Sequence, residues 1–386
     1  MNTSDFKQQL TEWRRYLHTI PETGFDLTLT PAFVADRLHA IGLEVHRNVG
    51  NTGVVGILRK GAGRRSIGLR ADMDALNIHE NTGLEYASCH PGKMHACGHD
   101  GHTTTMLGAA MLLASDYEFD GTVYFVFQPD EENGHGARAM IKDGLFDRFP
   151  MDEIYGAHNM PGIAAGKFAT REGGIMASED NFIIRIHGKG SHAARPHMGK
   201  DPIVIAAQII TTLQTIISRN LDPSLSAVIS CTEINSDGLR NVLPGFVEIK
   251  GDTRSYDPSV KRLLESRMHE VCEGICRLHG ARCEFIYTSE FSPTVNHAAQ
   301  TRFAVDSAVK IFGRDNVDSA TLPMMTSEDF GAFLEHIPGC FVFFGNGTEE
   351  QGKGYMPLHN AGYDFNDDIL TVGAHYFAEL AASRLI

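Results

Sequence analysis

The sequence predicts an α/β protein whose two chain ends build one domain with a mainly parallel central sheet, while the middle of the chain forms a smaller, inserted α+β domain. Three observations lead to this fold class. Apolar runs alternate with helical stretches before about residue 180, a β-α-β-β-α-β order follows, and the first pattern returns after residue 291. We therefore expect one domain over residues 1–179 and 291–386, and an inserted domain over residues 180–290.

The first two helices are indicated by apolar residues at helical spacing and by signals at their ends. Ser4 is the expected N-cap of a helix that ends before Pro21. A second helix begins near Pro31 and ends at Gly42. The apolar face of the first helix contains Phe6, Leu10, Trp13 and Leu17.

Several short apolar runs lack polar alternation, which is typical of strands covered on both faces. The clearest one, residues 123–127, reads Val-Tyr-Phe-Val-Phe. The other expected strands are residues 54–58, 67–69, 154–157 and 340–344. The helices expected between and after them are residues 102–114, 137–142 and 298–312, with a final helix that runs to the C-terminus.

The middle of the chain has a different pattern, in which apolar and polar residues alternate along the expected strands. The order of elements is β-α-β-β-α-β, which predicts a ferredoxin-like unit with a sheet and two helices. Its expected strands are residues 182–187, 225–233, 246–253 and 283–287, and its expected helices are residues 202–218 and 259–279.

The composition excludes several classes of function. The 386 residues contain 34 Lys+Arg and 48 Asp+Glu, a formal net charge of −14, so we expect neither a nucleic-acid partner nor a membrane partner. Polar residues interrupt the longest apolar stretch, residues 202–218, which predicts an amphipathic helix rather than a membrane span. No secretory signal is visible, and seven cysteines without a Cys-x-x-Cys pair favour free thiols in the cytoplasm.

Side chains that commonly bind metals follow several of the apolar runs. In open α/β sheets, ligands bind beyond the carboxyl ends of the strands, so a site is expected at these positions. Cysteine, histidine and glutamate are common metal ligands. The residues gathered at this predicted edge of the sheet are Cys97, His99, Glu131, Glu132, His158 and His359.

Each of these residues has an ordinary structural explanation when it is taken alone. A single His at a strand end is usually capped or solvated, a single Cys is usually a small buried hydrophobe, and Glu131-Glu132 would suit a solvated turn before a helix. Together they favour a metal site, because one of two adjacent carboxylates can bind a metal while its neighbour stays beside the water to be activated. We interpret the remaining histidines of this region as supporting or structural residues: His90, His95 and His102.

Other site signals are incomplete. The chain has no Gly-x-Ser-x-Gly turn for a serine nucleophile. His269-Glu270 begins a zinc-binding pattern that ends in Glu instead of His, and we expect Cys272 and Cys276 to pack in a core. The Gly-Asn-Gly at 345–347 lacks the further glycine and the lysine of phosphate-binding loops.

Longer segments, spread between residues 68 and 359, carry a resemblance to a known family. They are 68–76 (GLRADMDAL), 95–102 (HACGHDGH), 127–132 (FQPDEE), 156–159 (GAHN), 190–194 (GSHAA), 241–244 (NVLP), 327–330 (SEDF) and 358–359 (LH). In their order and joint occurrence they resemble the M20 metallopeptidase family. The resemblance is to its aminoacylase and hippurate hydrolase branch, which includes the auxin-conjugate amidohydrolases.

The resemblance implies a zinc-peptidase-like catalytic domain with an inserted lid and dimerisation domain, in agreement with the two domains predicted above. It also implies two divalent metal ions per subunit, which could be zinc, manganese, nickel or cobalt. The positions that match the family's ligands are Cys97, His99, Glu132, His158 and His359.

The resemblance implies roles for four further residues. Glu131 matches the general base, and His192 matches a residue that reaches the partner subunit's active site and stabilises the oxyanion. Asn241 and Arg254 match substrate contacts, and the guanidinium fork of Arg254 suits a carboxylate. A homodimer or a higher homo-oligomer is therefore implied.

The implied function is hydrolysis of the amide bond of small N-acyl amino acids, hippurate-like or N-acetylated, by a metal-activated water. Two alternatives remain open: a dipeptidase or carboxypeptidase on the same framework, and a catalytically silent protein that binds acylated small molecules. The sequence also departs from the family pattern at Asn77, Asp130 and Asn133, without removing a ligand. The extra carboxylate of Asp130 either strengthens cation binding or points to solvent.

Overall fold

The computed structural model describes residues 3–386, which form two compact units. The segment Met324–Glu328 groups with the second unit, although it is distant from the rest of that unit in sequence. The first unit contains the chain up to Ile175 together with Val295–Pro323 and Asp329–Ile386, and the second contains Met176–Thr294 and Met324–Glu328.

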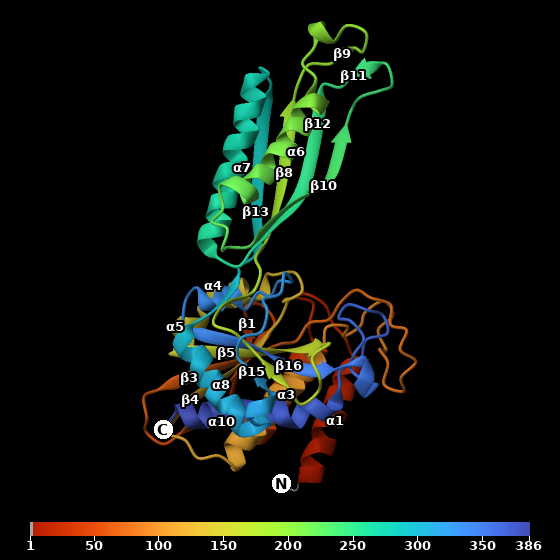
Figure 1. Ribbon diagram of the computed structural model, residues 1–386. Helices are drawn as coiled ribbons and strands as arrows, with labels where there is room; N and C mark the ends of the chain where they lie inside the picture. The colour runs from red at the N-terminus through yellow and green to blue at the C-terminus, as the bar shows by residue number, and fades with distance from the viewer. Residues whose placement is uncertain (1–2) are drawn as a thin grey trace. The chain divides into compact units, whose positions relative to one another are not determined.

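A mixed sheet forms the centre of the first unit (Figure 1). Within residues 3–386 it has eight strands in the order β1-β2-β4-β3-β5-β16-β6-β15. Its central strands β4, β3, β5 and β16 run parallel, whereas β1 and β2 pair antiparallel at one edge. Every residue of β4 is buried, as predicted for a strand covered on both faces. The strands are β1 (Glu44–Val49), β2 (Gly53–Lys60), β3 (Ser66–Asp72), β4 (Gly121–Gln128), β5 (Glu153–Pro161), β6 (Phe168–Ala169), β15 (Val317–Asp318) and β16 (Gly339–Gly347).

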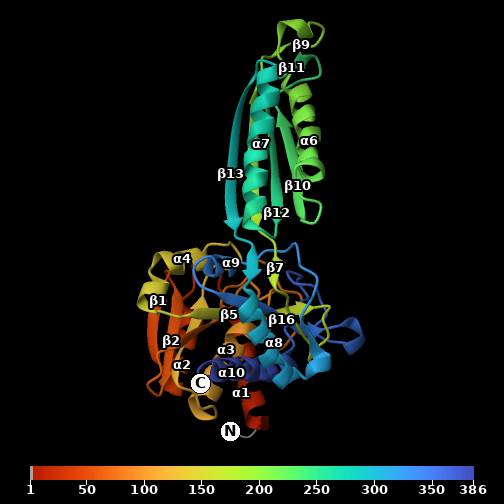
Figure 2. The same cartoon turned by 60° about the vertical axis from the view of Figure 1, so that its left-hand side comes forward.

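Helices pack on both faces of this sheet. On one face α3 contacts α1, α2 and α10, and α10 also contacts α8; on the other face α4 contacts α9 (Figure 2). The helices are α1 (Thr3–Thr19), α2 (Leu29–Ile41), α3 (His99–Ser115), α4 (Gly136–Lys142), α5 (Leu145–Arg148), α8 (Ala298–Phe312), α9 (Gly331–Leu334) and α10 (Leu370–Arg384). Short 3₁₀ turns span Arg314–Asn316, Glu349–Gln351 and Asp367–Ile369.

Buried charges join α1 to α3, the helix that begins at His99. The Nδ1 atom of His18 lies 2.7 Å from a carboxylate oxygen of Asp100, and Arg14 donates to Asp364 at 2.9 Å and to Asp367 at 2.6 Å. The side chains of Arg14, His18 and Asp100 are fully buried. Burial works against a charge on His18, but the Asp100 carboxylate outweighs it and raises the pKa of the imidazole to about 9.

This raised pKa predicts a pH-dependent stability. Because the pKa of His18 is higher in the folded protein than the value of about 6.5 in the unfolded chain, its contribution is fully present below pH 6.5 and is lost as the pH rises to about 9. The shift corresponds to about 3 kcal/mol. The free energy of unfolding of wild type minus that of His18→Gln should therefore shrink over this range. His39→Gln, on the exposed side of α2, is the control; a difference that stays constant with pH would contradict the prediction.

The second unit is an antiparallel sheet in the order β10-β12-β8-β13, with α6 and α7 packed side by side on it (Figure 2). This is the ferredoxin-like arrangement expected from the sequence, so the predicted fold class is confirmed. Cys272 and Cys276 lie in its core, as expected. The elements are β8 (Glu179–His187), β9 (Ser191–His192), α6 (Pro202–Arg219), β10 (Ala227–Ser236), β11 (Val242–Leu243), β12 (Phe246–Ser255), α7 (Pro258–Leu278) and β13 (Arg282–Phe291), with a 3₁₀ turn at Pro196–Met198. A separate pair joins β7 (Gly173–Met176) and β14 (Thr294–Asn296).

The helix α6 is the single helix among residues 3–386 that is long and apolar enough, by length and composition alone, to cross a membrane. Its residues Ile205, Ile209 and Leu213, at helical spacing, belong to the core of the second unit. The apolar character of this face is therefore explained by packing against the sheet.

Several helix boundaries differ from the sequence prediction, and two of these differences concern helix starts. Ser4 does not cap the first helix, because α1 already includes Thr3. The helix expected at residues 102–114 begins three residues earlier, at His99, with Gly98 as its N-cap. This earlier start places a candidate metal ligand on the first turn of the helix.

Candidate metal centre

The residues that the sequence singled out for metal chemistry meet at one edge of the central sheet of the first unit. Ligand atoms of Cys97, His99 and His158 lie within 4.8 Å of one another. The same distance limit holds for two further groups: Cys97, Glu132 and His359, and His99, Glu131 and Glu132. The three groups share members, so the structure brings all six side chains into one cluster.

The loop before α3 places Cys97 and His99 on either side of a glycine that no other residue could replace without strain. Gly98 has φ = 92°, a left-handed conformation that L side chains rarely adopt. A Cβ atom there would also lie 2.4 Å from the side-chain oxygen of Asn159. The backbone therefore turns tightly enough at Gly98 for Cys97 and His99, two residues apart, both to face the strand ends.

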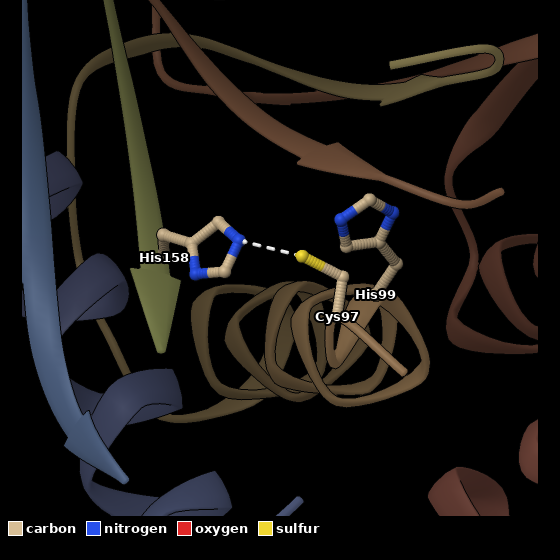
Figure 3. A group of neighbouring side chains, drawn as sticks. All are labelled: Cys97, His99 and His158. Atoms are coloured by element: carbon tan, nitrogen blue, oxygen red, sulfur yellow. Dashed lines mark hydrogen bonds between the residues drawn. The ribbon is translucent and has the colours of Figure 1, made fainter. Parts of the chain in front are cut away.

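His158, on β5, approaches Cys97 from the side opposite to His99 (Figure 3). Its Nδ1 atom lies 2.6 Å from the main-chain oxygen of Asn159, and its Nε2 atom lies 3.3 Å from the Cys97 sulfur. The carbonyl can only accept, so the proton is assigned to Nδ1, which leaves the Nε2 lone pair directed at the cluster. This is the tautomer that a metal-binding histidine requires.

Burial favours the neutral forms of His158 and Cys97. It lowers the pKa of His158 well below its usual value. It raises the pKa of the Cys97 thiol well above its usual value, and the nearby carboxylates of Glu132 and Glu131 raise it further. A bound divalent cation would reverse the preference of Cys97, because the thiolate is the form that binds metals.

Several buried donor atoms of the cluster have no protein partner. Within residues 3–386, both ring nitrogens of His99 and the Oε1 atom of Glu132 are buried without a hydrogen-bond partner. The shortest carboxylate approach to His99 is 3.5 Å, from Asp74 to Nδ1. Since buried polar atoms are rarely left unsatisfied, these atoms, together with the directed lone pair of His158, fit a divalent metal centre.

The carboxylates around His99 also decide its charge in the absence of metal. Burial lowers the pKa of His99, but Asp72 and Asp74 outweigh burial and raise it to about 10. Protons and metal ions therefore compete for this imidazole.

The sequence did not assign a role to Asp74, which holds the loop that carries the two glutamates. One oxygen of Asp74 accepts the backbone N–H of Glu131 at 3.1 Å, and the other accepts the backbone N–H of Glu132 at 3.1 Å. The spacing of Asp72 and Asp74 at the end of a buried strand could have indicated this role. Side chains two residues apart in an extended chain point to the same side, so both carboxylates are expected near the site.

Asp72 organises a second set of buried contacts behind the cluster. It lies 2.6 Å from Nδ1 of His102 and accepts from Arg70 at 2.8 Å. The Nε2 atom of His102 lies 2.7 Å from the side-chain oxygen of Asn159, so both ring nitrogens are occupied, consistent with the supporting role expected for this histidine. Arg70 also donates to Asp329 at 3.0 Å, and this ion pair is almost fully buried.

His359 completes the cluster from the loop after β16. Its Nε2 atom lies 3.3 Å from a carboxylate oxygen of Glu132, and its backbone N–H donates to Ala96 at 2.8 Å. His359 adopts φ = 63°, an uncommon conformation for a residue with a side chain. Its imidazole is 54% exposed, which leaves this side of the cluster open to solvent.

The remaining predicted site residues belong to the second unit. His192 lies in β9, where it pairs with Val242, and the backbone oxygen of Asn241 accepts the N–H of Ala193 at 3.0 Å. Arg254 lies near the end of β12, with ion pairs of 2.8 Å to both Glu179 and Asp252.

His192 and Asn241 therefore share one short two-stranded element, and the structure does not bring Arg254 to them. Asn241 precedes the first residue of β12, Phe246, whereas Arg254 is eight residues further along the same strand. At about 3.3 Å per residue, Phe246 and Arg254 lie roughly 26 Å apart along β12.

Cys, His and Glu donors that converge on a partly open cluster at the edge of an α/β sheet fit the class of metal-dependent hydrolases, whose metal centres keep a position open. The chain belongs to the peptidase family M20/M25/M40, whose model matches residues 68–383. The resemblance seen in the sequence is thereby confirmed.

Several relatives match nearly the whole chain. It is 40% identical to a hippurate hydrolase of Campylobacter jejuni, over 99% of this chain and 98% of that protein. It is 39% identical to an N-acetyl-L-cysteine deacetylase of Bacillus subtilis (100% and 90%) and 37% identical to a thermostable carboxypeptidase of Saccharolobus solfataricus (97% and 96%). The solved structure of a dinuclear metal binding peptidase of the M20 family from Bacillus subtilis matches with a TM-score of 0.86 and 33% identity, over 99% of each chain.

Proposed function

We propose that the chain hydrolyses the amide bond of N-acyl amino acids, with hippurate-like and N-acetyl amino acids as the substrate classes. The convergence of Glu131 with the donor cluster carries the proposal, because a carboxylate beside metal ligands is what activation of water requires. Similarity over almost the full chain to a hippurate hydrolase and to an N-acetyl-L-cysteine deacetylase supports the substrate class.

The proposed metal ligands, which together would hold two divalent ions, are Cys97, His99, Glu132, His158 and His359. When bound, such ions polarise the substrate carbonyl and lower the pKa of water from 15.7 towards about 7. The thiolate of Cys97 favours zinc, nickel or cobalt, whereas the carboxylate of Glu132 also accepts manganese. Zinc, nickel, cobalt and manganese are therefore the metals proposed for this site, because it combines the soft sulfur of Cys97 with the hard carboxylate of Glu132.

Glu131 acts as the general base. It takes the proton of the attacking water and then delivers it to the departing amine. Asp74 keeps the Glu131 backbone in place through the 3.1 Å hydrogen bond described above, and Glu131 itself is only 6% exposed, so its carboxylate is shielded from bulk water.

A panel of substrates tests this function on protein loaded with each of the four metals. N-benzoylglycine and N-acetyl amino acids should turn over with a higher kcat/KM than free-amine dipeptides. The similarity to a carboxypeptidase favours one competing function, a dipeptidase or carboxypeptidase on the same framework, for which the free-amine peptides would be the better substrates. No turnover with any metal would support the remaining alternative, a catalytically silent binder, and would contradict the proposal.

The proposed assembly is a homodimer formed through the second unit. The strand β10 is an edge of its sheet, and an edge strand offers unpaired backbone groups to a second chain. Exposed apolar side chains lie on β10 and at the start of α6: Ile234 is 53% exposed, Val204 49% and Ile203 45%. Burial of these residues against a second copy would remove them from water.

A dimer also explains the separation of His192 from Arg254. In the proposed complex, Arg254 binds the substrate carboxylate in its own subunit. His192, with Asn241, reaches the partner's substrate and stabilises the oxyanion. Roughly 26 Å of β12 lies between Phe246, which follows the element that carries His192 and Asn241, and Arg254, so one small substrate would not contact both His192 and Arg254 in the same chain.

Mixed dimers test the role of His192. A dimer of one His192→Ala chain and one Glu131→Gln chain contains one site with an intact Glu131 and an intact His192 from the partner. We expect each homodimeric variant to be almost inactive and the mixed dimer, purified by two different tags, to recover about half of the wild-type activity. No recovery in verified mixed dimers would contradict the exchange of His192 between subunits.

The proposed location is the cytoplasm. All seven cysteines are free thiols in the structure, and this pattern is typical of a reducing compartment.

A further inference from the structure

Asp130, the residue before the two glutamates of the candidate site, is both buried and held in an unusual backbone conformation. It is 2% exposed and has φ = 52°. Among residues 3–386, the other residues with a side chain and a positive φ are Asn48, Asn51 and His359. A carboxylate loses hydration on burial, and the left-handed conformation is strained for most side chains, so two unfavourable features occur in one residue.

The contacts of the carboxylate explain how Asp130 is accommodated. Its Oδ1 atom accepts a hydrogen bond from the side-chain amide of Asn133 at 2.5 Å, and its Oδ2 atom lies 3.4 Å from Nδ1 of His135. On the other side is Gly24, where an added Cβ atom would come within 3.1 Å of Oδ1. The side chain therefore points into the protein, and the possibility that it points to solvent is wrong.

The same loop is closed by its backbone. The main-chain oxygen of Asp130 accepts the N–H of His135 at 3.2 Å and that of Gly136 at 3.0 Å. Asp74 holds the N–H groups of Glu131 and Glu132, as described above. The carboxylate of Asp74, two residues after β3, thus holds the two glutamates, and the main-chain oxygen of Asp130 closes the turn that follows them.

Glycine would allow the same turn without strain, so the left-handed backbone alone does not explain an aspartate here. An aspartate adds an acceptor that binds side chains three and five residues further on. We propose that Asp130 is a positioning residue, whose carboxylate ties Asn133 and His135 back to the end of β4 and so orients Glu131 and Glu132 for metal binding and base catalysis. This inference rests on the function proposed above for the two glutamates.

Three single variants and one double variant separate this role from general stabilisation. Asp130→Gly keeps the backbone conformation and removes the carboxylate. Asp130→Asn keeps an oxygen acceptor for Asn133 and tolerates the same conformation. Asn133→Ala removes the donor on an exposed side chain, and the double variant Asp130→Gly/Asn133→Ala tests whether both residues act through one contact.

The measurement is calorimetric titration of metal-free protein with Mn²⁺, with thermal unfolding of the same metal-free samples as the control for folding. We expect Asp130→Gly and Asn133→Ala each to weaken Mn²⁺ binding about 10- to 100-fold without a matching change in the unfolding temperature. The double variant should lose no more affinity than Asp130→Gly, and Asp130→Asn should bind within about threefold of wild type.

Wild-type affinity in Asp130→Gly, or additive losses in the double variant, would overturn the inference. So would an Asp130→Asn variant as weak as Asp130→Gly, because charge rather than the hydrogen bond would then be responsible. If Asp130→Gly does not fold, Asn133→Ala and Asp130→Asn still decide the result. Mn²⁺ binding is measured without substrate, so a failure of the proposed hydrolysis, seen as no turnover by wild type, is distinguishable from a failure of this inference.

Discussion

Glu131→Gln should reduce kcat about 10²- to 10⁴-fold while leaving the metal content of the protein unchanged. The amide has nearly the shape of the carboxylate but cannot accept the proton of the attacking water. The backbone hydrogen bond from Glu131 to Asp74 does not depend on the side chain, so the loop should keep its conformation. The experiment combines steady-state kinetics with elemental analysis of the purified variant.

Glu349→Gln, in an exposed 3₁₀ turn, is the matched control and should behave as wild type. Full activity of Glu131→Gln would remove Glu131 from the mechanism. If Glu131→Gln lost its metal together with its activity, Glu131 would instead be a metal ligand. Its carboxylate lies within 4.8 Å of the ligand atoms of His99 and Glu132, so the geometry permits that role.

Cys97→Ala should have the second large effect, a loss of bound metal. Cys97 belongs both to the group with His99 and His158 and to the group with Glu132 and His359. Removal of the sulfur therefore takes a donor from both groups, and we expect metal content to fall below one ion per chain. Plasma mass spectrometry on dialysed protein measures the metal-to-protein ratio.

A buried cysteine outside the cluster separates metal loss from the loss of packing. Cys340, on β16, is fully buried in the core of the first unit. Cys340→Ala should be destabilised by the small cavity it creates but should keep its metal. A Cys97→Ala protein with the wild-type metal ratio would contradict the ligand assignment.

The main elements of the fold could be predicted because their apolar patterns are strong. The buried strand β4 and the amphipathic helices α6 and α7 fall close to the predicted ranges. The strand β1 was missed, because its sequence EVHRNV contains no apolar run and the strand is mostly exposed at the sheet edge. The two-residue strands β6 and β15 are too short to leave a periodic pattern.

The residues of the candidate site could be predicted because each metal-binding side chain follows an expected strand or precedes an expected helix. The parallel strands then bring Cys97, Glu132 and His158 to one edge. Contacts that depend on precise distances could not be predicted from the sequence. An example is the pair of hydrogen bonds that Asp74 accepts from the backbone N–H groups of Glu131 and Glu132. The burial of Asp130 was equally hidden, because a polar loop sequence suggests solvent exposure.

The most direct test of the metal centre is anomalous X-ray scattering from crystals of the zinc-loaded protein. We predict two anomalous peaks per chain, both bonded to side chains of the proposed ligand set: Cys97, His99, Glu132, His158 and His359. A single peak, or zinc bound away from these side chains, would contradict the two-metal hydrolase.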